Sequence, residues 1–345
     1  MIELGIDMFG DLQIDPKTGK IQSAATRLQE ILEEVKLMDE VGLDFFAVGE
    51  HHREDYAVAS PETFLAAAAA VTKNIKLSSA VSVISSADPV KLYQDFATVD
   101  LISDGRAEIM AGRGSFIESF PVFGYQLKNY EALFEEKLNL LVELNEKETI
   151  SWVGQFRPSL DNQTIYPQPK NGKMPIWVAV GGTPQSVIRA AKLGLPVMFA
   201  IIGGTIDRFK PLVEYYEQAW QSAGHSMDDY QVGVHMHSLF GENDTEIADW
   251  YYPSYAQQMD RIGKSRKWPP YQRHQYEAGR TEMGHLIVGD VNHAIDKILK
   301  TIETLGLTRF SAHMDVGAPD HDKMMKSIEL YGNKIAPKIR EALKK

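Results

Sequence analysis

The chain has 345 residues, and 44% of them are hydrophobic, which is enough for a sizeable core. A net charge of −11, with Lys and Arg scattered along the chain, argues against nucleic acid or an anionic membrane surface as a partner. The absence of cysteine excludes disulfides, thiolate catalysis and cysteine-ligated metal. Because the longest apolar stretch, residues 64–71, is far too short to cross a bilayer and the first residues lack the basic segment of a signal peptide, we expect a cytoplasmic protein.

Short apolar runs alternate along the chain with segments of helical periodicity. In residues 26–41, for example, apolar side chains recur at helical spacing and the segment ends at Val41-Gly42. This alternation predicts an α/β fold with a parallel sheet, and eight such units favour a closed (β/α)8 TIM barrel over an open doubly wound sheet. The runs are residues 2–8, 45–48, 75–84, 107–111, 176–180, 197–202, 232–239 and 309–314.

Two segments interrupt the alternation. Residues 150–174 combine alternating apolar residues with prolines, which predicts a small hairpin and an extended loop. Residues 241–285 form a polar and aromatic insertion before the last run, and such insertions in a barrel usually cover the active face. Since no linker rich in Gly or Ser separates the segments, we expect residues 1–345 to form a single domain.

Polar side chains follow several of the predicted strands, and in a barrel these strand ends meet at one mouth. Glu50 and His51 follow the second run, and Arg113 follows the fourth, between Gly112 and Gly114. An Arg between glycines suits bidentate contact with a phosphate. The alternative is an Arg that pairs with an acidic side chain, either Glu108 or Glu118, and the sequence favours neither interpretation.

The segment Gly181-Gly182-Thr183-Pro184 indicates a helix start directly after a strand, with Thr at the N-cap and Pro at the first helical position. Free N–H groups and the hydroxyls of Thr183 and Ser186 could bind a phosphate there, although a capped turn without a ligand is also common. Neither a G-x-G-x-x-G fingerprint nor a P-loop is present. A phosphorylated cofactor would therefore be held differently from NAD in a dinucleotide fold.

The paired histidines have different expected roles. His51 and His52 point to opposite sides if the backbone is still extended, so at most one faces the mouth, and the other makes a structural hydrogen bond. His235 and His237 lie on one face of a strand, and with Asp315 they imitate a metal site. We predict no metal, because a His pair without further ligands at matching spacing is more often pocket lining or hydrogen-bonded core.

Taken in order, the motifs resemble those of the bacterial luciferase-like flavin-dependent oxidoreductases, a superfamily of FMN-dependent monooxygenases and deazaflavin-dependent relatives. The resemblance runs nearly end to end, and no single motif decides it. The motifs are Gly49-Glu-His51-His52, Ser79-Ala-Val-Ser82 with Asp88-Pro-Val, Ser103-Asp-Gly-Arg106, Ala111-Gly-Arg113-Gly-Ser115, Gly181-Gly-Thr183, Leu193-Gly-Leu-Pro196 and the segment 328–337.

The resemblance implies a TIM barrel in which Arg113, Thr183 and Ser186 hold the phosphate of FMN, with Gly181 and Gly182 leaving room for it. It adds Ser115 to the cofactor-binding residues by position. Ser115 stands where luciferase has an apolar residue, so the substrate need not be an aldehyde.

The resemblance also places Ala80 and Val81 against the flavin ring, with a non-prolyl cis peptide bond. His51 matches the histidine that assists at the flavin as an acid, a base or a hydrogen-bond partner. Glu50, the second candidate catalytic residue, either orients His51 or serves as a buried salt-bridge partner.

The implied activity is a two-component monooxygenase, in which a separate NAD(P)H:flavin reductase supplies reduced FMN as a co-substrate and O2 oxygenates a small organic substrate. A homodimer is expected from the resemblance alone. Alternatives are an oxidoreductase that depends on the deazaflavin F420, a non-catalytic flavin-binding protein and, more remotely, a barrel enzyme that acts on a sugar phosphate without flavin.

Overall fold

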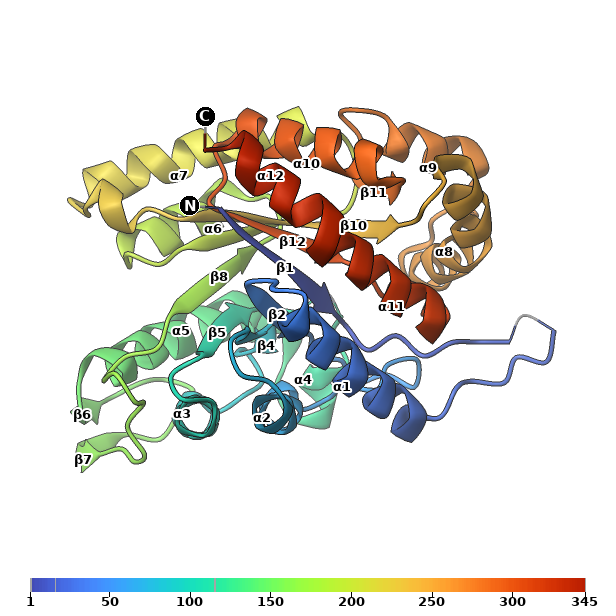
Figure 1. Ribbon diagram of the computed structural model, residues 1–345. Helices are drawn as coiled ribbons and strands as arrows, with labels where there is room; N and C mark the ends of the chain where they lie inside the picture. The colour runs from blue at the N-terminus through green and yellow to red at the C-terminus, as the bar shows by residue number, and fades with distance from the viewer. Residues whose placement is uncertain (1, 16, 115, 345) are drawn as a thin grey trace.

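The protein folds as a closed parallel β-barrel surrounded by helices (Figure 1). The computed structural model describes residues 2–15, 17–114 and 116–344. Each of the eight predicted runs contains a barrel strand, so the prediction of a (β/α)8 barrel is confirmed. The barrel strands are β1 Glu3–Met8, β2 Phe45–Val48, β3 Lys76–Ser79, β5 Ala107–Gly112, β8 Ile176–Val180, β9 Val197–Ile201, β10 Val232–Phe240 and β12 Arg309–His313.

Strand β10 closes the barrel because it pairs with a strand on each side. Its first half lies between β9, where Val232 faces Val197, and β12, where Gly233 faces Arg309. Its second half pairs with the short strand β11, Leu286–Gly289, which the sequence did not predict. A two-residue strand, β4 Ser82–Val83, continues the third run and pairs with β5.

Helices follow the strands and cover the barrel. Helix α1 has the predicted position and ends before Gly42, whose φ of 73° is the left-handed conformation that terminates a helix. The helices around the barrel are α1 Ala24–Glu40, α2 Pro61–Val71, α3 Pro89–Ser103, α4 Ser119–Val122, α5 Tyr130–Glu146, α6 Pro184–Lys192, α7 Lys210–Ser222, α10 Val291–Leu305, α11 His321–Leu330 and α12 Ala336–Ala342. None of the described helices is both long enough and apolar enough to span a bilayer.

The two interrupting segments lie at opposite ends of the barrel (Figure 1). Strands β6 Thr149–Trp152 and β7 Leu160–Thr164 form the predicted antiparallel hairpin. Residues 241–285 are mostly helical, as α8 Asp244–Arg266 and α9 Arg273–Arg280, and these helices lie at the end toward which the strands point. The second insertion is therefore placed beside the carboxyl ends of the strands, where barrel enzymes have their active sites.

A buried ion pair fills the opposite end of the barrel. Arg309 at the start of β12 contacts Glu108 on β5 through two bonds of 2.7 and 3.0 Å, and its guanidinium lies 4.1 Å from the ring centroid of Trp177. Both charged groups are almost completely buried. Glu108 was one of the two acidic partners of Arg113 considered from the sequence. In the structure it pairs with Arg309 and not with Arg113.

Candidate active site

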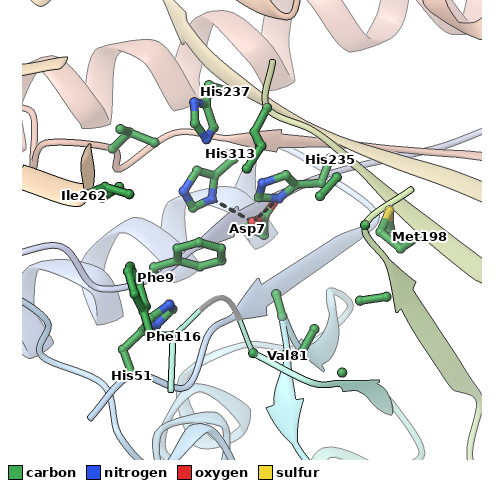
Figure 2. A pocket seen from close by; sticks show the side chains of 18 of the residues that line it. Asp7, Phe9, His51, Val81, Phe116, Met198, His235, His237, Ile262 and His313 are labelled. Carbon is green, nitrogen blue, oxygen red and sulfur yellow. Dashed lines mark hydrogen bonds and ion pairs between the residues drawn. The ribbon is translucent and has the colours of Figure 1, made fainter. Parts of the chain in front are cut away.

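The carboxyl ends of the strands surround a cavity of about 620 Å³, a typical size for a ligand site (Figure 2). Six of the residues proposed from the sequence as catalytic or cofactor-binding line this cavity: Glu50, His51, Ala80, Val81, Arg113 and Gly181. Gly182, Thr183 and Ser186 lie in the turn and helix start next to it. Ser115 falls outside the described residues.

His51 lies in the wall of the cavity among aromatic rings. Its imidazole stacks on Tyr56 with a centroid distance of 4.3 Å and an angle of 18°, and it lies 4.6 Å from the ring of Phe9. Burial lowers its pKa from the usual 6.5 to about 3, and the neighbouring charged groups act in the same direction. Its Nδ1 is buried without a hydrogen-bond partner among the described residues. His51 is therefore a neutral imidazole with an unused polar atom.

Glu50 is bonded to His52, not to His51. One carboxylate oxygen lies 2.8 Å from His52 Nε2, and the other accepts the N–H of Val83 at 2.7 Å. His52 does not line the cavity. Glu50 therefore has the position of a salt-bridge partner, of His52, and does not orient His51. Its bond to Val83 also holds the backbone two residues after Val81.

The segment of Ala80 and Val81 crosses the cavity at close range to two strand ends. The peptide bond between these residues is cis, as the resemblance implied. A Cβ on Gly112 would lie 2.6 Å from the side chain of Val81, and a Cβ on Gly49 would lie 3.1 Å from the carbonyl oxygen of Ala80 and 2.6 Å from the ring of Phe9. Glycine is required at both positions because any side chain would collide with the wall of the cavity.

A candidate phosphate site lies at one rim of the cavity, and we use the name phosphate site for Arg113, Thr183 and Ser186. Arg113 at the end of β5 donates to Ser186 Oγ at 3.2 Å, and Ser186 Oγ lies 2.8 Å from Thr183 Oγ1. Thr183 is the N-cap of α6, and Pro184 occupies the first turn, as predicted. In the first turn of α6, Pro184 has no N–H and the N–H of Ser186 bonds to the carbonyl oxygen of Thr183 at 3.1 Å, so the N–H of Gln185 is left to bind an anion.

Glu131 is the acidic partner of Arg113, and the sequence did not identify it. It forms an ion pair with Arg113 and also approaches Arg189 at 3.5 Å. The second alternative from the sequence, Glu118, pairs instead with Arg53 at 2.8 Å. Arg189 Nη1 is buried without a partner among the described residues. Two guanidinium groups, one of them with an unused N–H donor, and two hydroxyls thus lie together at this rim, a donor set that fits a phosphate monoester.

A cluster of imidazoles lies across the cavity from the phosphate site, and the sequence identified only part of it. His235, His237 and His313 each offer a nitrogen atom within 4.8 Å of the others, a spacing that could also hold a metal ion. Asp7 Oδ2 lies 2.7 Å from Nδ1 of both His235 and His313 (Figure 2). The sequence analysis had grouped Asp315 with the two histidines of β10. In the structure the third member of this group is His313.

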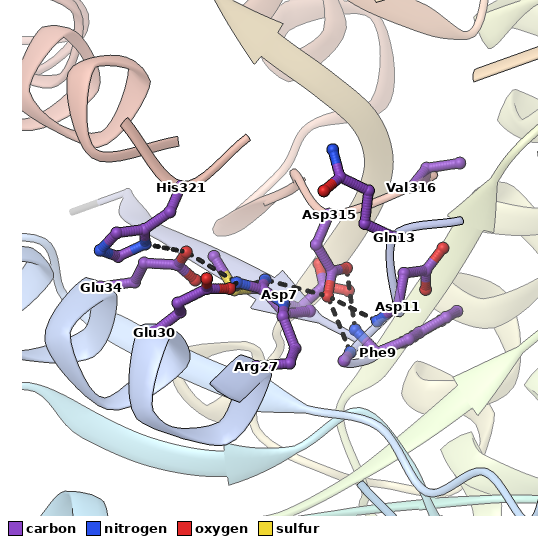
Figure 3. Close-up of polar contacts among 12 residues, drawn as sticks. Asp7, Phe9, Asp11, Gln13, Arg27, Glu30, Glu34, Asp315, Val316 and His321 are labelled. Carbon is purple, nitrogen blue, oxygen red and sulfur yellow. Dashed lines mark hydrogen bonds and ion pairs between the residues drawn. The ribbon is translucent and has the colours of Figure 1, made fainter. Parts of the chain in front are cut away.

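Asp315 holds the loop that follows β1 (Figure 3). Its carboxylate accepts the N–H groups of Phe9 at 2.9 Å, Gly10 at 2.7 Å and Asp11 at 3.2 Å. Arg27 approaches the same carboxylate at 3.7 Å. This network sets the position of Phe9 and Asp11, both of which line the cavity.

Helix α8 and the residues after it form part of the outer wall. Gln258, Met259, Ile262 and Trp268 line the cavity, and Gln258 donates to Tyr56 Oη at 3.1 Å. The insertion thus contributes side chains to the cavity rather than only lying above it. Together the walls are largely apolar and aromatic, with polar groups concentrated at the phosphate site and in the imidazole cluster.

Comparisons with known proteins agree with this arrangement. A family model described as luciferase-like monooxygenase matches residues 7–309. The chain is 24% identical over 331 residues to the alkanal monooxygenase alpha chain of Photorhabdus laumondii, and the match covers 89% of this chain and 90% of that protein.

Solved structures with the same fold include enzymes with different cofactors. The monooxygenase RslO1 from Streptomyces bottropensis has a TM-score of 0.84 at 23% identity, over 98% of this chain and 99% of that one. The oxygenating constituent of 3,6-diketocamphane monooxygenase from Pseudomonas putida, in complex with FMN, has a TM-score of 0.75 at 21% identity, over 98% and 99%. The coenzyme F420-dependent tetrahydromethanopterin reductase from Methanopyrus kandleri has a TM-score of 0.73 at 18% identity, over 98% and 99%.

Proposed function

Because the chain belongs to the luciferase-like monooxygenase family, we propose that it binds FMN in this cavity and uses reduced FMN with O2 to oxygenate a small organic substrate. The observation that carries the proposal is the phosphate site at the rim of a cavity whose wall contains His51. Arg113, Thr183 and Ser186 would hold the phosphate. Gly181 leaves room beside them, since a Cβ there would meet nothing within 4 Å.

The residues of the cavity support this chemistry in distinct ways. Reduced FMN would supply the electrons that activate O2. His51 resists protonation because it is buried, so it is suited to hydrogen bonding from a neutral ring more than to storing a proton. Glu50 acts as a positioning residue through the backbone of Val83. The apolar side chains of α8 would limit the access of water to the reacting groups.

Cofactor titrations test this proposal against its alternatives. We expect added FMN to give a bound absorption spectrum, and added F420 to give none at the same concentration. If F420 binds and FMN does not, the protein is a deazaflavin-dependent oxidoreductase. If neither binds, a sugar phosphate becomes the better ligand for the phosphate site.

Oxygen uptake separates an enzyme from a flavin-binding protein without activity. When reduced FMN is supplied, we expect the protein to consume O2 faster than free reduced FMN does. Free reduced FMN is oxidised without transferring oxygen to a product. A bound flavin that reacts with O2 only as fast as free flavin, in the presence of any candidate substrate, would indicate a non-catalytic binding protein.

We also propose that a separate NAD(P)H:flavin reductase supplies the reduced FMN, because the sequence carries no nicotinamide fingerprint. Oxidation of NADH by the purified protein and FMN alone, at an ordinary enzymatic turnover, would contradict this two-component arrangement.

A homodimer is proposed through the outer surface of α2 and α3. Val71 on α2 and Leu101 and Ile102 on α3 are each about half exposed, and these helices pack side by side. Exposed apolar side chains on neighbouring helices are typical of a protein interface. Sedimentation as a monomer at micromolar concentration would remove this proposal.

A further inference from the structure

The imidazole cluster contains a carboxylate–imidazole pair that faces the cavity. Asp7 lies in the buried part of β1, and its Oδ2 lies 2.7 Å from His235 Nδ1 on β10 and 2.7 Å from His313 Nδ1 on β12. Its Oδ1 accepts the hydroxyl of Ser311 at 2.5 Å. Asp7, His235 and His313 all line the cavity. None of these contacts involves the phosphate site or His51.

The hydrogen bonds of Asp7 fix the tautomer of His235. Burial alone would raise the pKa of Asp7, but the charges and hydrogen bonds of His235 and His313 hold it far below its usual range. A carboxylate only accepts hydrogen bonds, so both imidazoles must carry a hydrogen on Nδ1. In its neutral form His235 then has a lone pair on Nε2. Nε2 makes no hydrogen bond to any described residue, and the accessible part of the ring faces the cavity.

The other two imidazoles are less suited to accept a proton. Burial would lower the pKa of His313, but Asp7 and then Asp315 and Asp11 raise it to about 9, so this ring is an imidazolium at neutral pH. Burial and the neighbouring imidazoles lower the pKa of His237 well below 6.5, and its Nδ1 bonds to Tyr255 Oη at 2.9 Å. His235 is therefore the ring of the cluster with a carboxylate behind it and an open nitrogen in front.

We propose that His235, oriented by Asp7, is a general base that removes the proton of an acidic hydroxyl group on the substrate, which is a phenol or an enol. The arrangement is that of a carboxylate-oriented imidazole facing a ligand, in which the carboxylate holds the tautomer and stabilises the imidazolium that forms. The substrate class follows from the walls. Phe9 lies nearly parallel to His235 at 5.7 Å, and Trp268, Met198 and Phe116 add apolar surface, so a flat ring with one ionisable hydroxyl fits.

The step transfers one proton and no electrons. The O–H bond of the substrate breaks, its electron pair stays on the substrate oxygen, and the proton forms a bond to His235 Nε2. The imidazolium of His313, whose ring centroid lies 4.5 Å from that of His235, stabilises the oxyanion that results. This inference rests on the proposed function in one respect, because a phenolate or enolate has the electron-rich carbon that a flavin monooxygenase would oxygenate.

Binding of 4-nitrophenol to the protein without flavin tests the base directly, because its phenolate absorbs visible light and its phenol does not. At a pH below the probe's own pKa, we expect the wild-type protein to raise the phenolate fraction of the bound probe roughly tenfold over that of the free probe, the effect of one pKa unit. His235→Asn should abolish the phenolate band, while equilibrium dialysis still shows the probe bound. His274→Asn, which removes an exposed imidazole on α9 outside the cavity, should behave as wild type.

Several results would overturn the assignment. They are failure of the wild-type protein to bind the probe, binding without a phenolate band, and a phenolate band that persists in His235→Asn but disappears in His237→Asn. Loss of the band on treatment with a chelator, with recovery on addition of zinc, would mean that the three imidazoles hold a metal ion that ionises the probe. His235→Asn keeps a side-chain N–H close to the position of Nδ1 for Asp7. If this variant does not fold, as judged by circular dichroism, His235→Gln serves instead.

The FMN titration is independent of this experiment. A phenolate band in a protein that does not bind FMN would retain the base and remove the proposed function. FMN binding without a phenolate band would do the reverse.

Discussion

Removal of Arg113 should separate the contribution of the phosphate from that of the flavin ring. FMN and riboflavin share the ring, and only FMN carries the charge that Arg113 would bind. A hydrogen bond to a charged group contributes about 1.5–3 kcal/mol, which corresponds to roughly a 10- to 150-fold change in affinity. We therefore expect Arg113→Ala to weaken FMN by that factor and to leave riboflavin nearly unchanged, as measured by fluorescence quenching of each flavin.

The structure adds a second arm to this experiment, because Glu131 already occupies Arg113. A bound phosphate must compete with this carboxylate for the guanidinium. Glu131→Gln should release Arg113, so FMN should bind as tightly as to the wild type or more tightly. Arg157→Ala is a matched control, since Arg157 pairs with Asp88 at 3.1 Å and does not line the cavity. Equal weakening of FMN and riboflavin by Arg113→Ala would refute the phosphate assignment.

Three further predictions concern activity and stability. His51→Ala should retain FMN binding while product formation falls by roughly 10²–10⁴, and parallel measurements of O2 consumption and hydrogen peroxide release should show that flavin oxidation continues without product. The hydrogen bond to Glu34 raises the pKa of His321 to about 9. The contribution of His321 to the free energy of unfolding should therefore be complete below pH 6.5 and lost as the pH rises through 9. Urea unfolding below pH 6.5 and above pH 9 should show this loss in the wild type and not in His321→Ala. Arg309→Met should lower the free energy of unfolding by about 3–5 kcal/mol, because it removes the buried partner of Glu108 and leaves this carboxylate with the partly exposed Lys76 at 3.3 Å. The double variant with Glu108→Gln should recover part of the loss, and an unchanged urea midpoint would contradict this.

The barrel could be predicted because its strands are buried on both faces and therefore appear as short, continuous apolar runs. All eight were found in this way. Strand β11 was missed because its four residues follow directly on the insertion and pair only with the end of β10. The helical character of residues 241–285 was missed for a different reason. Helix α8 contains Pro253, and its buried side chains mix Ile247 and Ala248 with Tyr251, Tyr255 and Gln258, so no simple apolar stripe marks it.

The helix start at the phosphate site was predictable from local signals, and the imidazole cluster was not. A glycine pair, an N-cap and a proline within four residues define a helix start wherever the chain folds. By contrast, Asp7 meets His313 only because β1 pairs with β12, and His313 meets His237 only because β12 pairs with β10. Asp7 and His313 are 306 positions apart in the sequence, and His237 and His313 are 76 positions apart. A polar residue near the end of an apolar run was the available signal, and it was used for Glu50 but not for Asp7.

Phe9 lies between the two sides of the cavity, and no sequence motif pointed to it. Its ring lies 4.6 Å from His51 and 4.2 Å from His313 (Figure 2). Its position depends on Asp315, which accepts the N–H of Phe9 and does not itself line the cavity (Figure 3). Asp315 therefore fixes the distance between His51, which we place beside the flavin, and the imidazole cluster, which we place beside the substrate. Such an arrangement favours reaction, because the two ligands must be held in a fixed relative orientation for oxygen transfer to occur.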